Sequence, residues 1–138
     1  MRAFKLVAVV LPLLLAVSAC ESEIDNIPTT PDPVTVTETF SGSININGAA
    51  THTFFTTATG AVTATLTSLG DNPPAQVGFS VGTFAGANCS LIITNDKAVV
   101  TTVVTGVVTT LGGSLCVRIY DVGSLTESVP YEIRVEHK

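Results

Sequence analysis

The chain has 138 residues and a formal charge of −5; 12% of its residues are charged and 46% are hydrophobic. Its six basic residues are scattered, which argues against a nucleic-acid partner, because the phosphate backbone requires clustered Lys and Arg. The apolar residues are mainly Val, Ala, Leu and Ile interleaved with Thr, a composition that favours strands over helices. We therefore expect one small all-β domain.

The first 19 residues have the three parts of an export signal. Arg2 and Lys5 form a positive start, residues 6–17 are apolar, and small residues then lead to Cys20. The apolar run is shorter than the roughly 20 residues that a transmembrane helix needs. Residues 1–19 are therefore predicted to be a cleaved signal peptide.

The end of this signal, Val17-Ser18-Ala19-Cys20, resembles the bacterial lipobox, in which an aliphatic residue and two small ones precede a lipidated cysteine. The resemblance implies that Cys20 carries diacylglycerol and palmitate-type acyl chains, which anchor the protein to a membrane at about 0.8 kcal/mol per buried CH₂. The alternative is simple secretion with a free or paired Cys20. By the same resemblance, Glu21 rather than Asp implies a location in the bacterial cell envelope that favours the outer over the inner membrane.

Residues 20–33 are predicted to be a flexible linker. After Cys20 they carry four acidic residues and three prolines, with no apolar period. Such a segment cannot bury enough apolar surface to order itself, and its prolines keep it extended. The linker leads into a domain over residues 34–138.

Three stretches of this domain alternate apolar and polar residues, namely 62–67, 77–82 and 129–136. Alternation with a period of two predicts strands that are buried on one face. Gly, Asn and Pro interrupt the domain every 8 to 15 residues or so, as in a sandwich or barrel. Helical spacing is absent.

Less regular segments complete the predicted strands: 34–46 (with Phe40, Ile44 and Ile46 in phase), 51–57, 89–94, 98–111 and 114–121. Asn95-Asp96-Lys97 lies between two apolar runs and predicts a hairpin. Residues 98–111 are apolar on both faces and contain Gly106, which indicates either a central strand with a bulge or two short strands.

Cys89 and Cys116 remain as a pair once Cys20 is assigned to lipid, and an oxidising compartment favours a disulfide between them. In the chain-entropy model, a bridge around a loop of about 28 residues stabilises a fold by roughly 3 to 4 kcal/mol. Alternation places Cys116 outward and Cys89 inward, so the bridge requires Cys89 at a strand end, in the loop after Asn88. Two buried free thiols are the alternative.

Four segments carry a family resemblance: 51–54, 60–69, 116–123 and 129–135. Their Phe-led strand, Thr-rich strand after Gly60 and late Tyr120-Asp121 pair resemble the bacterial pre-peptidase C-terminal domain over most of residues 36–138. The resemblance implies a single antiparallel β-sandwich, jelly-roll-like, with about eight strands. Such domains accompany exported hydrolases and are thought to assist secretion or bind surfaces, whereas this sequence has no peptidase segment.

Calcium enters through the same resemblance, because related collagenase domains bind it with an acidic cluster near the start of the domain. This sequence has only Glu38 there, which leaves Asp121 as the calcium candidate. Calcium prefers six or more oxygen ligands, and an aspartate in Tyr120-Asp121-Val122-Gly123 also suits a turn. We expect the turn role, with no metal and no other cofactor.

Catalytic motifs are absent from the sequence. It contains no Gly-x-Ser-x-Gly, no His-Glu-x-x-His and no glycine-rich phosphate loop. His137 lies one residue from the C-terminus, where chains fray, and His52 lies in a strand-like segment as a structural or surface imidazole. We therefore expect no catalytic residues and no enzyme activity.

Phe54 and Phe55 are adjacent, so a regular strand must point one of them away from the core, unless both faces of the strand are buried. An exposed aromatic favours recognition of a ligand. The sequence thus predicts a non-enzymatic, lipid-anchored envelope protein that binds or adheres to a polymer or protein, with a polysaccharide or protein ligand. The alternative is a structural or export-accessory envelope component without a ligand site.

Overall fold

The computed structural model describes residues 30–138, so the predicted signal peptide, Cys20 and most of the linker lie outside the described residues. Residues Asp32–Lys138 form one compact unit. This unit contains its own hydrophobic core and both cysteines of the predicted bridge, so we expect it to fold without the preceding residues. Within the described part, no helix is long and apolar enough to cross a bilayer.

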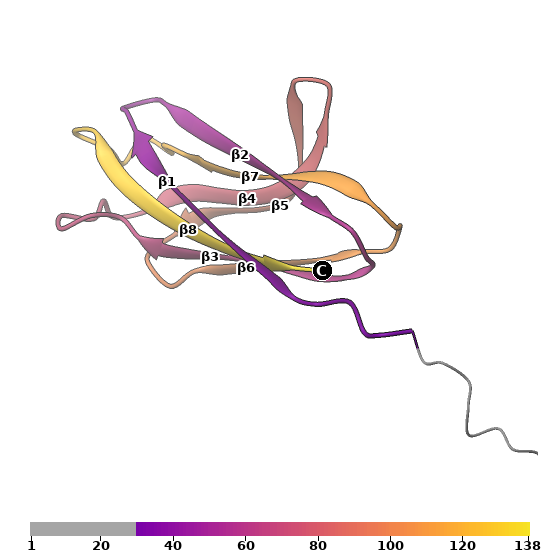
Figure 1. The fold of residues 1–138 in the computed structure, drawn as a ribbon. Coiled ribbons are helices and arrows are strands. Elements are labelled where there is room, and N and C mark those ends of the chain that lie inside the picture. Colours follow the sequence, from indigo (N-terminus) through magenta and orange to yellow (C-terminus); the bar gives the residue numbers. More distant parts are fainter. Residues whose placement is uncertain (1–29) are drawn as a thin grey trace, which may run out of the picture. The chain divides into compact units, whose positions relative to one another are not determined.

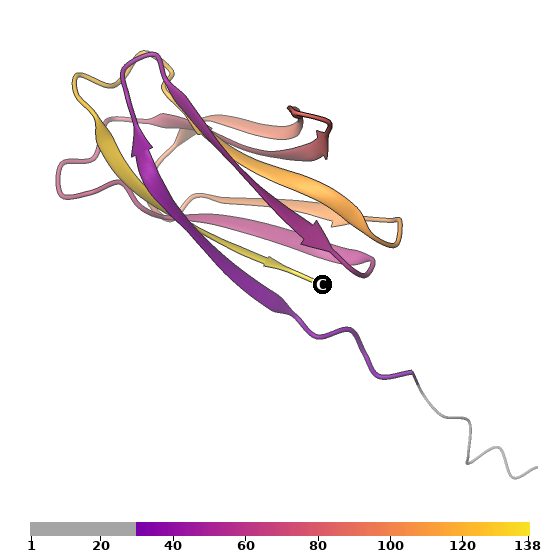
Figure 2. The same cartoon turned by 45° about the horizontal axis from the view of Figure 1, so that its top comes forward.

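Eight antiparallel strands build the unit (Figure 1). They are β1 (Val36–Ile44), β2 (Ala49–Thr56), β3 (Gly60–Ser68), β4 (Val77–Ala85), β5 (Asn88–Ala98), β6 (Val103–Val108), β7 (Gly113–Tyr120) and β8 (Val129–His137). Sheet A has the order β1-β8-β3-β6, and sheet B has the order β2-β7-β4-β5. Figure 2 shows the two layers packed face to face. This is the strand order of a jelly roll, so the predicted antiparallel β-sandwich is confirmed.

Alternation along the strands creates the core between the sheets. In β8, Val129, Tyr131, Ile133 and Val135 are buried, and the residues between them face solvent. The buried residues share the core with the inward residues of β3, in the same sheet, and of β7, in sheet B. The fully buried side chains include Leu66, Phe79 and Ile119. Each such side chain contributes about 1.5 to 3 kcal/mol through removal of apolar surface from water.

The predicted hairpin at Asn95-Asp96-Lys97 is wrong, because β5 runs without interruption from Asn88 to Ala98. Its register against β4 passes from Phe79↔Asn95 to Val77↔Ala98, so one extra residue of β5 is accommodated in a bulge. The Lys97 N–H donates to the Asn95 side-chain oxygen at 2.9 Å inside this bulge. The sequence signal of a turn therefore marks an irregularity within a strand.

Residues 98–111 form neither of the two arrangements that the sequence left open. Ala98 ends β5, a turn with Thr101 at φ 78° follows, and β6 is a single short strand at the edge of sheet A. The Thr102 hydroxyl accepts the Val99 N–H at 2.9 Å and closes this turn. β6 is apolar on both faces. One face, with Val104, is turned to the core, and the other, with Val103 and Val107, is exposed.

The sequence predicts Ile46 to be in phase with Phe40 and Ile44, and this prediction is wrong. The strand ends at Ile44, and Ile46 lies in the turn to β2 with 51% of its surface exposed. The next residue, Asn47, has a φ of 55°, a left-handed conformation that asparagine tolerates better than most residues. The chain reverses here before another inward position can follow.

Candidate functional site

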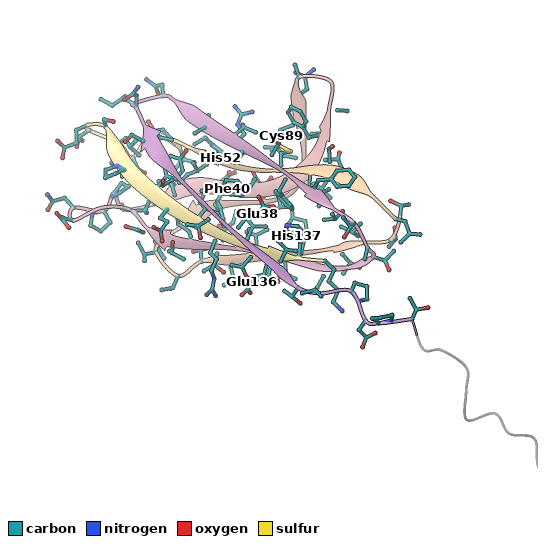
Figure 3. The ribbon with its side chains drawn as sticks, in the orientation of Figure 1. Glu38, Phe40, His52, Cys89, Glu136 and His137 are labelled. Carbon is teal, nitrogen blue, oxygen red and sulfur yellow. A yellow bond between two sulfur atoms is a disulfide. The ribbon has the colours of Figure 1, made fainter. Side chains whose placement is uncertain are left out.

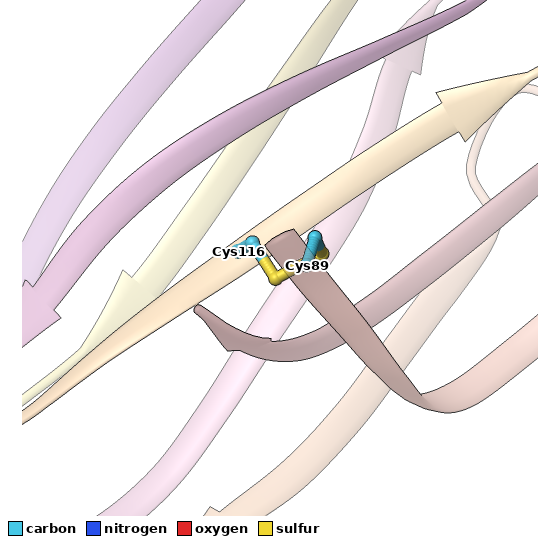
Figure 4. The surroundings of a disulfide bond; sticks show 2 residues. All are labelled: Cys89 and Cys116. Carbon is cyan, nitrogen blue, oxygen red and sulfur yellow. A yellow bond between two sulfur atoms is a disulfide. The ribbon is translucent and has the colours of Figure 1, made fainter. Parts of the chain in front are cut away.

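The disulfide between Cys89 and Cys116 is present, with a Cα–Cα distance of 5.9 Å (Figure 4). Cys89 is the second residue of β5, so the expected place at a strand end is confirmed, but the residue lies within the strand and not in the loop that was predicted. Cys116 belongs to the outward set of β7, yet it is fully buried. Its burial follows from the bridge, because the start of β5 lies over the outer face of sheet B at this point.

Small residues on the outer face of β4 allow this covering. A Cβ added to Gly82 would lie 2.1 Å from the carbonyl oxygen of Ser90, so only glycine lets the β5 backbone approach so closely. The ladder between β4 and β5 also shifts register between Val81 and Gly82. The far half of the β4–β5 hairpin thereby bends away from the plane of the sheet, and it projects from the body of the sandwich in Figure 1.

Tyr120 covers the other small residue on this face. A Cβ at Gly78 would lie 2.1 Å from the Tyr120 ring, and the Tyr120 hydroxyl donates a hydrogen bond to Asp96 in the β5 bulge. Burial and this bond to Asp96 raise the pKa of the Tyr120 phenol to about 12. Tyr120 therefore remains a neutral hydrogen-bond donor across the physiological range.

The outward residues of β2 and β7 form a continuous row on sheet B, which we call the β2/β7 strip. Its cross-strand pairs are Ala49–Tyr120, Thr51–Arg118, Thr53–Cys116 and Phe55–Ser114. At the strand rise of about 3.3 Å per residue the strip is roughly 20 Å long. Its β2 side is exposed at Thr51, Thr53 and Phe55, whereas its β7 side is covered at Cys116 by the disulfide-linked start of β5.

A hollow lies at each end of the β2/β7 strip. One is lined by Asn47, Gly48, Ala49, Leu91, Arg118, Tyr120 and Asp121. The other is lined by Glu38, Thr53, Phe54, Phe55, Phe84 and Ser114. The first is mainly polar, and the second presents aromatic rings.

Phe55 is the exposed aromatic that the sequence allowed for. It is 56% exposed at one end of the strip, whereas Phe54 points into the core and is only 5% exposed. The reading in which both faces of this strand are buried is therefore wrong. Sequence reasoning missed Phe84, Arg118 and Tyr120 as neighbours of this surface. The sequence does contain a signal for them: the outward residues of β4 are small, and small residues allow other groups to lie over that face.

Asp121 secures the polar end of the strip. Its carboxylate accepts the backbone N–H groups of Asn47 (2.8 Å), Gly123 (2.8 Å), Ser124 (2.9 Å) and Leu125 (3.2 Å). The bond from Asn47 is the main cause that holds the pKa of this carboxyl below its usual value. Both oxygens of Asp121 are thus engaged, and it joins the β1–β2 turn to the loop after β7. The expected turn role is what the contacts show.

Calcium does not suit this arrangement. Asp121 is the sole carboxylate in its hollow and shares it with the cation Arg118. Calcium requires six or more oxygens, and the oxygens of Asp121 already accept backbone N–H groups. Among residues 30–138, no group of three His, Cys, Asp or Glu side chains comes together as a metal site would require.

His52 is half-buried and lies beside Phe40 of sheet A (Figure 3). Its ring stacks on Phe40 at a centroid distance of 4.9 Å, and its Nε2 is 2.8 Å from the Tyr131 hydroxyl. Burial lowers the pKa of His52. Tyr131 can reach this position because residue 42 is a glycine. A Cβ at Gly42 would lie only 2.6 Å from the Tyr131 hydroxyl oxygen. The His52–Tyr131 bond therefore ties β2 of sheet B to β8 of sheet A.

His137 does not fray, contrary to the expectation from its position. It is 3% exposed, pairs with Val36 in the β1–β8 ladder and places its Nε2 2.9 Å from Glu38 Oε1. The Thr57 N–H donates to the carbonyl of Lys138 at 3.1 Å, which fixes the chain end. Glu38, the one acidic residue near the start of the domain, thus contacts a histidine at its end.

Comparisons with known proteins bear on the fold. The sequence matches no protein-family model and no curated protein. A solved structure, the crystal structure of Yersinia pseudotuberculosis-derived mitogen (YPM), is similar with a TM-score of 0.56 and 20% sequence identity. The match covers 76% of this chain and 88% of that chain. At this identity the likeness shows a shared β-rich fold alone.

Proposed function

We propose that this protein is a non-enzymatic, lipid-anchored module of the bacterial cell envelope, which binds a polymer or a protein along the β2/β7 strip. The observation that carries the proposal is Phe55, an aromatic ring 56% exposed beside a hollow that also contains Phe84. Large apolar side chains in an exposed, concave setting are characteristic of recognition surfaces.

The composition of the strip supports recognition over catalysis. Aromatic rings and arginine supply most of the binding energy at protein interfaces, and the strip has Phe55 at one end and Arg118 at the other. Thr51, which is opposite Arg118, and Thr53 supply hydroxyl groups that can exchange hydrogen bonds with a sugar or a peptide backbone. The imidazoles of His52 and His137 face the core instead, where they join strands.

The anchoring half of the proposal depends on the lipobox-like Val17-Ser18-Ala19-Cys20. Glu21 favours the outer membrane, and the likeness to the pre-peptidase C-terminal domain supports attachment to a surface. Expression of the full chain in a bacterium followed by mass spectrometry tests it. We expect a mature chain that begins at an acylated Cys20, and a Cys20→Ser chain that leaves the membrane fraction. A mature chain without acyl groups would overturn the anchor.

The binding half is tested with the oxidised domain, residues 32–138, on an array of peptidoglycan, polysaccharides and matrix proteins. We expect saturable binding to one class, at equal strength with calcium and with chelator. Phe55→Ala should weaken it by about 30-fold or more, since truncation of an aromatic anchor costs about 2 kcal/mol or more. Val36→Ala is the matched control, because Val36 is exposed on the other sheet.

The outer face of sheet A favours the second candidate, a structural or export-accessory component without a ligand site. One cross-strand row reads Thr37–Glu136–Thr63–Thr105, and Arg134 pairs with Glu136 at 3.7 Å. This face presents hydroxyl groups together with Glu132, Arg134 and Glu136, and none of the named residues is aromatic. If the domain binds no component of the array, the strip has no ligand and the structural role takes the place of the binding role.

A further inference from the structure

The edge strand β6 differs from the other edges of the sandwich. The two sheets leave four described edge strands, β1 and β6 in sheet A and β2 and β5 in sheet B. Three of them contain titratable side chains: Glu38 in β1, His52 in β2, and Asp96 and Lys97 in β5. β6 has none, and the sequence has no charged residue between Lys97 and Arg118.

Exposed apolar side chains gather around the same edge. Of ten exposed large hydrophobic residues in the described part, Val103 and Val107 lie on β6, and Val99 and Leu111 lie in the segments that precede and follow it. Val107, on β6, is 74% exposed. An apolar cavity of about 220 Å³ opens beside the strand and is lined by residues of β3, β4, β5, β6 and β7, among them Val62, Ile92 and Val107.

An unpaired edge of this kind is rarely left unprotected. Natural proteins block edge strands with charges, proline or a covering segment, because unpaired N–H and C=O groups otherwise accept another strand. β6 carries no charge and no proline along Val103–Val108, and no strand within residues 30–138 is hydrogen-bonded to its outer edge. The edge therefore has the chemistry of a strand that pairs with an uncharged partner.

We infer that β6 pairs antiparallel with β6 of a second copy of this chain, joining two A sheets into one of eight strands. The segment Val-Val-Thr-Gly-Val-Val is nearly the same read in either direction. Antiparallel pairing about Thr105 places Thr105 opposite Thr105 and Val103 opposite Val107 on the exposed face. Such self-complementarity is what a two-fold interface requires.

Charge favours a second copy at this edge. Each chain has a formal charge of −5, so two copies repel each other where acidic groups meet. The uncharged span of β6 lets two copies approach without that repulsion. The β2/β7 strip lies on sheet B, so this interface is separate from the proposed ligand surface and does not depend on it.

The size of the interface predicts a concentration-dependent dimer. Stable complexes bury about 800 Å² per partner, more than one short strand pair supplies. The flanking apolar side chains Ile92, Val103, Val107 and Leu111 add to the strand pair. We therefore expect the oxidised domain, residues 32–138, to change from one to two chains per particle as its concentration rises in sedimentation equilibrium.

Two lysine variants locate the interface. Val107→Lys places a charge on β6 and should return the domain to a monomer at every concentration measured. Val36→Lys places the same charge on an exposed valine of β1, the opposite edge of sheet A, and should leave the dimer unchanged. A wild-type domain that stays monomeric, or a dimer that survives Val107→Lys, would overturn the proposal. Binding of an unrelated uncharged peptide strand by such a monomer would assign the edge to another protein.

Single cysteines test the register. Residues directly opposite each other in an antiparallel pair have Cα atoms about 4.5 to 5.5 Å apart, within the range of a disulfide. Thr105→Cys should therefore form covalent dimers on mild oxidation. Val103→Cys alone should not, because its two copies would be about 13 Å apart along the strands. A mixture of Val103→Cys and Val107→Cys should cross-link. Cross-linking of Val103→Cys alone would contradict the antiparallel pairing.

Discussion

Adjacent residues with opposite roles define the surface of sheet B. Phe54 and Phe55 have the same side chain, and strand alternation alone sends one to the core and the other to solvent. The sequence could predict that alternation but not which ring is buried, since this depends on which face of β2 meets sheet A. The same applies to His137, whose burial follows from pairing with β1, about a hundred residues away in the chain.

At Asp121, removal of the carboxylate should destabilise the domain. Asp121→Ala leaves four backbone N–H groups without their acceptor. We expect a lower urea midpoint at pH 7 for this variant, and little change for Asp71→Asn in the exposed β3–β4 loop. The lowered pKa of Asp121 also means that its contribution is present above pH 4 or so and is lost as pH falls through the lowered value. If Asp121→Ala unfolds at the wild-type midpoint, the turn role is wrong.

His52 should make the stability of the domain depend on pH near neutrality. Its folded-state pKa is lowered from 6.5 by burial, so the unfolded chain takes up a proton first as the pH falls. Its contribution to stability is therefore complete above about pH 7 and declines as the pH falls through 6.5 towards the lowered pKa. The glutamine in His52→Gln still offers Tyr131 a hydrogen-bond partner but does not titrate. In this variant the urea midpoint should therefore depend less on pH below about pH 7. An unchanged slope in the variant would contradict this account.

The β4–β5 hairpin shows where local signals failed at the level of elements. The Asn95-Asp96-Lys97 signal is used in a bulge, and the bend over sheet B arises from Gly82 and the disulfide rather than from turn residues. The chain turn after Ala98 has no Gly or Pro; Thr101 adopts positive φ there instead. Strands with clear alternation, β3, β4 and β8, were correctly predicted as strands. The predicted burial on one face only is wrong for β4, which is buried on both faces from Val77 to Gly82 because Tyr120 and the start of β5 cover its outer side.

Loss of the disulfide should release this hairpin. The double variant Cys89→Ala and Cys116→Ala removes a crosslink worth roughly 3 to 4 kcal/mol in the chain-entropy model. We expect a fall of that order in the free energy of unfolding by urea, together with protease cleavage in the hairpin tip near Gly86. Reduction of the wild-type domain should reproduce both effects. Equal stability in the presence and absence of the bridge would show that packing alone holds the hairpin.

Gly82 should tolerate no side chain. Gly82→Ala places a Cβ 2.1 Å from the backbone of Ser90, and relief of that overlap should cost about 1 to 3 kcal/mol. Gly113→Ala is the control, because its Cβ would meet nothing closer than 3.8 Å. Thermal or urea unfolding of both variants makes the comparison. A neutral Gly82→Ala would mean that the hairpin does not lie as closely over β4 as described.

For the whole molecule, composition and alternation predict a β-sandwich, but they do not determine the strand order. The order β1-β8-β3-β6 joins the first strand to the last, and such distant pairing leaves no local trace in the sequence. The expectation of a jelly roll came from a family resemblance. The candidate site was harder to predict, since the β2/β7 strip combines residues from both halves of the chain.

The two outer faces of the molecule differ in the side chains that they present. Sheet A carries threonines and a compensated ion pair and ends at the uncharged edge β6. Sheet B carries the strip with Phe55, bordered by the disulfide-linked hairpin. The proposed ligand surface on sheet B and the proposed dimer edge at β6 are therefore separate, and occupation of one would leave the other free.

The most direct test of the proposed function is an NMR map of the ¹⁵N-labelled domain, residues 32–138, titrated with the ligand class found on the array. We predict that amide shifts change along β2 and β7 and in the hairpin over sheet B, centred on Phe55, while the outer rows of β3 and β8 stay unchanged. Shifts confined to sheet A, or a map unchanged by Phe55→Ala, would contradict the assignment of the β2/β7 strip as the recognition surface.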